Sequence, residues 1–447
     1  KRRLHSTLLP ASILQSRMKR IIFLITAFVA LSCGAQTSLR EIEENPLKAG
    51  GVYYAYPITV ENMTAVINQA PVPKGYEPFY VSHYGRHGSR YLISDNDYRL
   101  VIDKLQDARA AGALSSLGED VLNRLEKVWE EAEGRGGDLT PLGVRQHKAI
   151  AGRLAEKYPQ IFKKGDTEIS ARSTTVIRCV LSMDAFCERL KELNPKLNIT
   201  RESSQRYMDY LNYHSTESNA FTGEKGPWQE EYRKFRIEHT NPERLMKQLF
   251  TNDEWVYKNV NPEELMWGLY WIAVDMQNME TEISFMDLFT PQELFDLWQC
   301  VNYGFYVRDS NYAGNEGLVV ANARNLLDNI ITSADEAISQ NKPSATLRFG
   351  HDGNLIPLTA ILGLEGCDAS VSDPKTFYQH FADFKIAPMA GNVQMIFVRN
   401  KKNPKDVLVK IMLNEQDKAI PAMEKPDTHP WYKWEDLKRH YKAKWHL

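Results

Sequence analysis

Apolar and polar positions along this chain recur with two different periods, one typical of strands and one typical of helices. Strand-like runs of β-prone or alternating residues occupy 79–81, 168–170, 345–349, 392–398 and 407–413. Helix-period apolar positions occupy 97–133, 143–158, 176–190, 318–338 and the run from 355 to 364. Thr140 followed by Pro141 is a typical helix start. Because strands and helices alternate, the sequence predicts an α/β core.

The middle of the chain differs from both flanks. From 194 to 307, aromatic and charged residues recur at helical spacing and no strong strand pattern is seen. Aromatic residues at that spacing are more typical of a helical core than of a ligand platform. We therefore expect a helical insertion domain at 194–307, between a first part of the core at 45–193 and a second part at 308–447.

Composition and charge limit the classes of function. The 447 residues are 43% hydrophobic and 25% charged, as in ordinary globular proteins. Lys and Arg number 55 against 57 Asp and Glu, and a net charge of −2 argues against a nucleic-acid partner. After Cys33 come Cys179, Cys187, Cys300 and Cys367, without zinc-ligand spacing, so we expect buried free thiols.

The N-terminal stretch 1–35 has the features of a leader. Met18-Lys19-Arg20 precedes apolar or small residues from 21 to 31 and a small-residue exit ending at Ala35, which predicts a secretory signal peptide at 18–35. This run is too short for a hydrocarbon layer of roughly 30 Å, so no integral membrane span is expected. The protein is thus predicted to be secreted, periplasmic or on the outer surface of a bacterium. Cleavage after Ala35 is favoured, while a loose likeness to a lipoprotein box leaves a lipid anchor at Cys33 open.

Five residues carry the first chemical signal: Arg86-His87-Gly88-Ser89-Arg90. They follow the strand-like run at 79–81, so they are expected where a buried strand opens into a loop, as ligand sites in α/β sheets do. Two guanidiniums beside one imidazole suit a dianionic phosphate, because each guanidinium binds two oxygens and a neutral ring nitrogen can attack phosphorus.

A second cluster lies far downstream, at Gly350-His351-Asp352-Gly353-Asn354. A strand before it and a helix after it place Asp352 near a helix N-terminus. Taken alone, the simplest interpretation of Asp352 is an N-cap, which does not exclude a catalytic acid.

The two clusters together resemble the histidine acid phosphatases, the acid-phosphatase and phytase branch of the histidine phosphatase superfamily. Similar segments follow in the family's order from about 79 to 415: Leu139-Thr140-Pro141-Leu142-Gly143 with Gln146, then Arg172-Ser173-Thr174 with Arg178, Ser182 and Ala185-Phe186. The stretch 409–415 is similar to a strand of the multiple inositol polyphosphate phosphatases. Two positions depart from the pattern: Tyr91 follows Arg90 where the family usually has Pro, and His351-Asp352 replaces the His-Ala-Glu usual in inositol polyphosphate phosphatases.

The resemblance implies a fold and a division of labour. The fold would be a central mixed sheet with helices on both faces, as in phosphoglycerate mutases, with the helical insertion above the site. His87 would be the nucleophile that forms a phosphohistidine, and Asp352 the general acid. Arg86, Arg90, Arg178 and His351 would bind the phosphoryl oxygens. No cofactor and no metal are expected, because three guanidiniums would take the role that magnesium has elsewhere.

The implied activity is a secreted phosphomonoesterase acting on a small-molecule phosphate ester, with inositol polyphosphates such as phytate as the expected substrates. A broad-specificity acid phosphatase or a sugar-phosphate phosphatase is the main alternative. A phosphotransferase or mutase, and a phosphate-binding protein without activity, are further alternatives.

Overall fold

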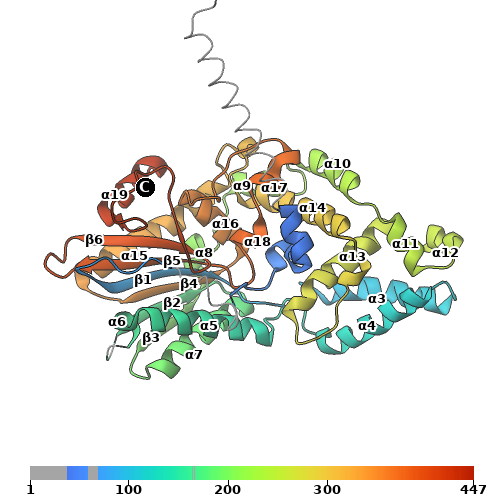
Figure 1. Ribbon diagram of the computed structural model, residues 1–447, viewed down its shortest axis with the longest axis horizontal. Coiled ribbons are helices and arrows are strands. Elements are labelled where there is room, and N and C mark those ends of the chain that lie inside the picture. Colours follow the sequence, from blue (N-terminus) through green and yellow to red (C-terminus); the bar gives the residue numbers. More distant parts are fainter. Residues whose placement is uncertain (1–37, 59–68, 164, 166) are drawn as a thin grey trace, which may run out of the picture.

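The computed structural model describes residues 38–58, 69–163, 165 and 167–447, and one mixed β-sheet forms its core (Figure 1). The predicted signal peptide at 18–35 and Cys33 lie outside the described residues. The strands are β1 (Tyr76–Arg86), β2 (Glu168–Ser173), β3 (Asn198–Ser203), β4 (Ala345–Gly350), β5 (Asn392–Asn400), β6 (Val407–Leu413), β7 (Gln416–Lys418) and β8 (Tyr432–Lys433). Their order is β3-β2-β4-β1-β5-β6-β7, with β8 beside β6.

Parallel and antiparallel pairs both occur in this sheet. β1 runs parallel to β4, β4 to β2 and β2 to β3, whereas β5 is antiparallel to β1 and β6 antiparallel to β5. The predicted mixed α/β sheet is therefore confirmed. In the β1–β4 register Arg86 lies opposite Gly350, so the two motif-bearing strands end side by side.

Helices cover both faces of the sheet because side chains of each strand alternate between them (Figure 1). Tyr80 and Tyr84 of β1 belong to the core that includes α15 and α16, whereas Val81 belongs to the core that includes α5 and α7. The helices of these layers are α5 (Pro141–Lys157), α6 (Pro159–Phe162) and α7 (Ile177–Leu193) on one side, and α8 (Met208–Leu211), α15 (Arg324–Gln340), α16 (Asp352–Ile361) and α19 (Trp434–Trp445) on the other.

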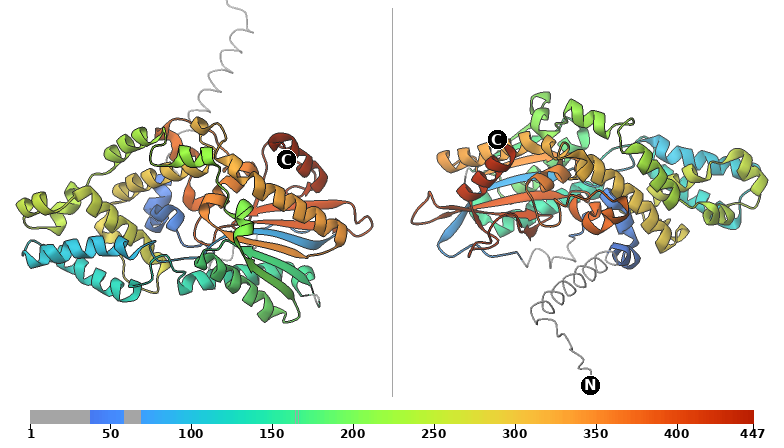
Figure 2. Two further views of the ribbon diagram at one scale, coloured as in Figure 1. Left: turned by 180° about the vertical axis from the view of Figure 1, so that it is seen from behind. Right: turned by 90° about the horizontal axis from the view of Figure 1, so that it is seen from above.

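A second, helical part lies at one end of the molecule (Figure 2). It comprises α3 (Asp95–Ala110), α4 (Ser116–Ala132), α9 (Thr216–Thr222), α10 (Gln229–His239), α11 (Glu243–Leu249), α12 (Asp253–Asn259), α13 (Pro262–Asp275) and α14 (Pro291–Asp309). α3 packs on α13 and α4 on α11, so two helices that precede β2 join the helices from the middle of the chain. Their buried side chains, among them Val101 and Tyr270, share one core.

The remaining helical elements are short. They are η1 (Pro46–Tyr53), η2 (Gln205–Tyr207), η3 (Met276–Asn278), η4 (Met286–Leu288), η5 (Ala313–Asn315), η6 (Val320–Ala323), η7 (Pro374–Thr376), α17 (Phe377–His380) and α18 (Asp383–Ile386). η1 lies against α13, α14 and α18, and it is the element that later brings Tyr53 to the site.

Two expectations from the sequence need correction. The helical insertion was expected from residue 194, but 198–203 form β3, an edge strand of the sheet. Most of its side chains are exposed or half-buried, so it has no apolar alternation to reveal it. The single helical stretch at 97–133 is two helices, α3 and α4, separated by a turn at Gly112, whose φ is +64°.

Other expectations are confirmed. Thr140 caps α5, because its side chain accepts a hydrogen bond from the Gly143 amide. The four cysteines after Cys33 are buried free thiols. In the part of the chain that the structure describes, no helix combines the length and the apolar character that crossing a membrane requires.

Candidate active site

The two sequence clusters meet where β1 and β4 end. His87 directly follows β1, and its backbone amide donates to the Gly350 carbonyl at 2.9 Å. His351 is the N-cap residue of α16 and Asp352 is the first residue of that helix. The imidazole rings of His87 and His351 lie 5.7 Å apart between centroids. We call the site formed by Arg86, His87, Arg90, Arg178, His351 and Asp352 the anion pocket.

Asp352 does not act as the N-cap that the simplest interpretation of the sequence suggested. His351 occupies that position, and the Asp352 carboxylate turns back to accept from the Gly353 amide at 2.8 Å and to pair with Arg86. The ion pair joins Asp352 Oδ2 and Arg86 Nη2 at 2.8 Å. The Asp352 carboxylate therefore pairs with the Arg86 guanidinium of the neighbouring strand and does not cap the helix.

Arg86 is fully buried and is held from several sides. Its Nη1 donates to the carbonyl of Val52 and, at 2.7 Å, to the carbonyl of Ala387, while Nη2 pairs with Asp352. These partners come from η1, from the loop after α18 and from α16, so one side chain ties three elements to the end of β1. A buried charge is tolerated only with such partners.

The loop at 87–90 is fixed by hydrogen bonds from α5 and α7. The Gly88 amide donates to Ser182 Oγ at 3.1 Å, and the Ser89 amide donates to Gln146 Oε1 at 2.9 Å. A Cβ on Gly88 would lie 2.6 Å from the backbone of Gly143, so only glycine fits there. The glycine at 88 therefore makes room for α5.

The imidazole of His87 has one defined tautomer. Its Nδ1 lies 2.9 Å from the Gly88 carbonyl oxygen, and a carbonyl only accepts, so Nδ1 carries the ring proton and Nε2 keeps its lone pair. Burial and then the guanidiniums of Arg86, Arg90 and Arg178 hold the pKa of His87 well below its usual value. The ring is therefore neutral, which is the form that can attack an electrophile.

Two further arginines offer free donors to this pocket. The Nε atoms of Arg90 and Arg178 are buried without a hydrogen-bond partner among the described residues. Arg178 is the second residue of α7, and Arg90 lies with its guanidinium 4.6 Å from the Tyr53 ring centre. Buried donors without partners next to a neutral imidazole form a site prepared for an anion.

His351 and Asp352 complete the electrostatics. Burial, countered in part by Asp352, lowers the pKa of His351 to about 4, and its Nε2 lies 3.2 Å from Thr174 Oγ1. For Asp352, burial acts to raise the pKa, but the Arg86 guanidinium, His351 and Arg90 outweigh it, so the pKa is lowered. The carboxylate is therefore ionised at neutral pH.

Known proteins share the sequence pattern and the fold of this chain. The sequence profile of the histidine phosphatase superfamily (branch 2) matches residues 85–414, from the end of β1 to the end of β6. The chain belongs to this superfamily. The family predicted from the sequence, and with it the class of enzyme, a phosphatase, are confirmed. Among curated proteins, no sequence matches the chain.

Solved structures share the fold of this histidine phosphatase. The multiple inositol polyphosphate phosphatase of Bifidobacterium longum, in complex with inositol hexasulfate, superposes with a TM-score of 0.71 at 18% identity, covering 89% of this chain and 98% of that one. A phytase from D. castellii gives 0.60 at 14% identity, covering 89% and 85%. A Hafnia alvei phytase in complex with tartrate gives 0.52 at 13% identity, covering 83% and 98%.

Several residues of the histidine phosphatase site carry no signal in the sequence. Ser89 Oγ donates to Asn278 Oδ1 at 2.7 Å, and Asn278 Nδ2 donates to the Asp275 carboxylate at 3.1 Å. Asp309, the last residue of α14, points its carboxylate at Gly353, since a Cβ there would lie 3.4 Å from Asp309 Oδ1. Asn278, Asp275, Asp309 and Tyr53 reach the site only through packing of distant helices, so no local motif could have identified them.

Proposed function

We propose that this histidine phosphatase hydrolyses phosphate monoesters through His87 and that it acts outside the cytoplasm on inositol polyphosphates such as phytate. The observation that carries the proposal is the neutral, buried His87, whose Nδ1 lies against the Gly88 carbonyl and whose pKa is lowered by burial and by the guanidiniums of Arg86, Arg90 and Arg178. Such an arrangement binds a dianion and offers it a nucleophile.

In the first step, His87 Nε2 forms a bond to phosphorus while the bond to the leaving oxygen breaks. Arg86, Arg90 and Arg178 balance the negative charge of the equatorial oxygens, as other phosphoryl-transfer enzymes do with metal ions and arginines. His351 donates to one oxygen. Asp352 takes up a proton from solvent when the substrate dianion binds beside Arg86, and it passes that proton to the leaving alkoxide, because an alkoxide is a poor leaving group without a proton.

In the second step, water attacks the phosphohistidine. The Asp352 carboxylate, now without its proton, takes one from that water as the N–P bond breaks and inorganic phosphate leaves. The free enzyme keeps Asp352 ionised beside Arg86, and a phosphate dianion in the pocket offsets that guanidinium. We therefore expect higher activity at acidic than at neutral pH.

One observation supports inositol polyphosphates as substrates, and another favours a second candidate. One structural neighbour is named a multiple inositol polyphosphate phosphatase and was solved with inositol hexasulfate, and two others are named phytases. His351-Asp352 stands where inositol polyphosphate phosphatases usually have His-Ala-Glu, which favours a broad-specificity acid phosphatase or a sugar-phosphate phosphatase as the second candidate.

The test is acid quenching and mass spectrometry of the enzyme during turnover of phytate and of para-nitrophenyl phosphate. We expect a phosphorylated peptide that contains His87, and no phosphate release from the His87→Ala variant. His440→Ala, which removes an imidazole from α19, is the matched control and keeps full activity. Unchanged turnover in His87→Ala would refute the mechanism, and a strong preference for the aryl ester would favour the second candidate.

The proposed location is tested separately. The mature protein isolated from its host should begin at Gln36 if the signal peptide at 18–35 is cleaved after Ala35. A diacylglycerol on Cys33 would replace simple secretion by a lipid anchor. A chain that keeps residues 18–35 in the cytoplasm would contradict both.

A further inference from the structure

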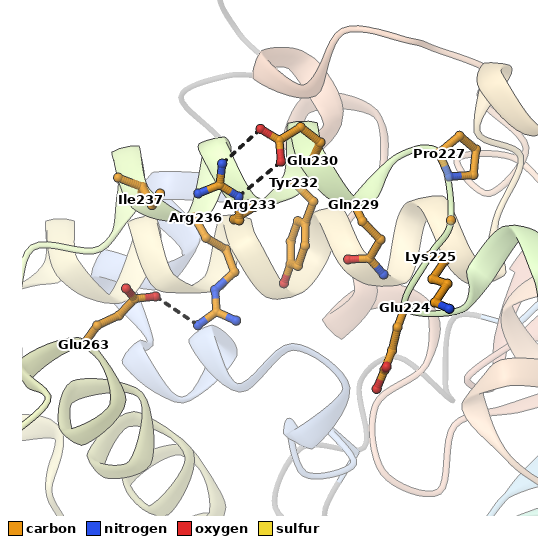
Figure 3. A pocket seen from close by; sticks show the side chains of 11 residues that line it. Glu224, Lys225, Pro227, Gln229, Glu230, Tyr232, Arg233, Arg236, Ile237 and Glu263 are labelled. Atoms are coloured by element: carbon orange, nitrogen blue, oxygen red, sulfur yellow. Dashed lines mark hydrogen bonds and ion pairs between the residues drawn. The ribbon is translucent and has the colours of Figure 1, made fainter.

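In the helical part, three hollows share Arg236 of α10 in their lining: α13 contributes to all three, α3 to one and α14 to another. Figure 3 shows the outer one, of about 700 Å³, in which the Arg236 side chain runs from α10 toward Glu263 while Arg233 turns to Glu230. The innermost one, of about 140 Å³, places Arg236 and Arg308 between the aromatic rings of Tyr232, Trp267, Trp271 and Phe305. We call this innermost space the inner hollow.

The inner hollow differs from its neighbours in charge. Its lining includes two arginines and no carboxylate. Glu224, Glu230 and Glu263 line the outer hollow together with three cations, and Asp97, Glu263 and Glu264 line the third hollow around Arg236 alone. Of these three hollows, only the inner hollow therefore has a net positive lining, and a positive lining attracts anions.

Both arginines of the inner hollow are held by aromatic faces and keep donors free. The Arg236 guanidinium lies 4.5 Å from the Trp267 ring centre, with one long contact of 3.4 Å to Glu263, and its Nε is buried without a partner among the described residues. The Arg308 guanidinium lies 5.2 Å from the Phe305 ring centre, and its Nε donates to the Gly304 carbonyl at 3.0 Å. Within the described ranges, the Nη atoms of Arg308 have no hydrogen bond or ion pair.

The inner hollow adjoins the anion pocket along both helices. Trp271 lies one helical turn, about 5–6 Å, before Asp275 on α13, and Phe305 lies one turn before Asp309 on α14. The rings of Trp271 and Tyr53 are 5.3 Å apart, and Tyr53 in turn lies under Arg90. Tyr53 and Trp271 therefore connect Arg90 of the anion pocket with the inner hollow through two successive ring contacts.

We propose that the inner hollow binds a second phosphate group of the substrate whose first phosphate lies in the anion pocket. This inference rests on the proposed function and extends it to a substrate class: organic esters with at least two phosphates. The aromatic faces restrict the arginine side chains, so little side-chain entropy is lost when the second phosphate binds. Glu263, at the outer side of Arg236, opposes further phosphates beyond that point.

The test compares steady-state kinetics on phytate and on para-nitrophenyl phosphate, which has a single phosphate. Arg308→Ala and Arg236→Ala should each lower kcat/KM for phytate by tenfold or more, through a higher KM, with a change of less than threefold on para-nitrophenyl phosphate. Arg233→Ala is the matched control. It is an arginine of the same helix, α10, but it is paired with Glu230 and lies outside the inner hollow, so both substrates should be unaffected.

The outcomes separate this inference from the proposed function. Equal losses on both substrates in Arg308→Ala, or no loss on phytate in both variants, would overturn the second phosphate subsite while leaving the phosphatase activity in place. Failure of the wild-type enzyme to release phosphate from either substrate would instead overturn the proposed function. A phytate-specific loss that Arg308→Lys partly restores supports the subsite.

Discussion

Two groups of arginines in this molecule are held in opposite ways. In the anion pocket, Arg86 is fully buried and bound by two carbonyl oxygens and a carboxylate, so polar partners from three elements fix it. In the inner hollow, Arg236 and Arg308 rest on aromatic rings and leave donors free. The first arrangement contributes to the fold as well as to the site, whereas the second contributes little beyond binding. Removing an arginine from each region should separate these two roles.

The largest effect is expected from Arg86→Ala. It leaves the Val52 and Ala387 carbonyls and the Asp352 carboxylate without their donor, so the free energy of unfolding should fall by about 2–4 kcal/mol. This is below the full cost of breaking a buried pair, because 24% of the Asp352 side chain is exposed. Phosphatase activity should fall by about 10³-fold or more. Urea unfolding and kcat/KM measure the two effects.

Arg308→Ala is the contrasting variant for stability. Among the described residues its guanidinium makes one hydrogen bond, to the Gly304 carbonyl of its own helix, so the free energy of unfolding should change by less than about 1 kcal/mol. An equal loss of stability in both variants would contradict the distinction between the two regions.

The second effect concerns Asp352, the proposed general acid. Asp352→Asn removes the proton that the leaving oxygen needs, so kcat for phytate should fall by about 10²–10⁴-fold. The loss on para-nitrophenyl phosphate should be smaller, because nitrophenolate leaves without a proton. Rapid-quench measurement of phosphoenzyme formation on each substrate checks this difference, and equal losses on both would remove Asp352 from the acid role.

The same contrast explains what the sequence could predict. Arg86 ends one strand with a clear β-prone pattern, and His87 and the pair His351-Asp352 directly follow such strands. All four lie in short motifs, so local information pointed to them and the topology brings them together. Arg178 was identified by its place in a longer family segment. Asp309 and Asp275 end α14 and α13, and nothing near them in the sequence relates them to a phosphate site. Long-range packing alone decides such positions, as it also decides the polar edge strand β3.

The third effect concerns the pH dependence of stability that the buried Asp275 should cause. Burial raises the pKa of Asp275 to about 7, although Arg90 and hydrogen bonds from Asn278 and Tyr98 act against it. An unfolded Asp has a pKa of about 3.9, so between about pH 4 and 7 the folded protein binds more protons than the unfolded one. The stability that Asp275 contributes is therefore present at low pH and lost as the pH rises through that window.

Asp275→Asn should remove this dependence. Relative to the variant, the wild-type free energy of unfolding should decrease by roughly 2–4 kcal/mol between pH 4 and pH 7.5. Melting temperatures of both proteins across this range measure it. Parallel curves for the two proteins would show that the Asp275 carboxyl does not change the pH dependence of the free energy of unfolding.

The smallest effect is expected from Glu263, the carboxylate beside Arg236 of the inner hollow. Glu263 is the only carboxylate that pairs with Arg236 among the described residues, at 3.4 Å and with both side chains partly exposed, so the pair is weak. Glu263→Gln keeps the size of the side chain and removes a negative charge that opposes a phosphate. The KM for phytate should therefore fall about two- to fivefold, corresponding to roughly 0.4–1 kcal/mol, with no change on para-nitrophenyl phosphate. A higher KM for phytate would mean that Glu263 orients Arg236 for binding, and the aromatic faces alone would then not suffice to hold that guanidinium.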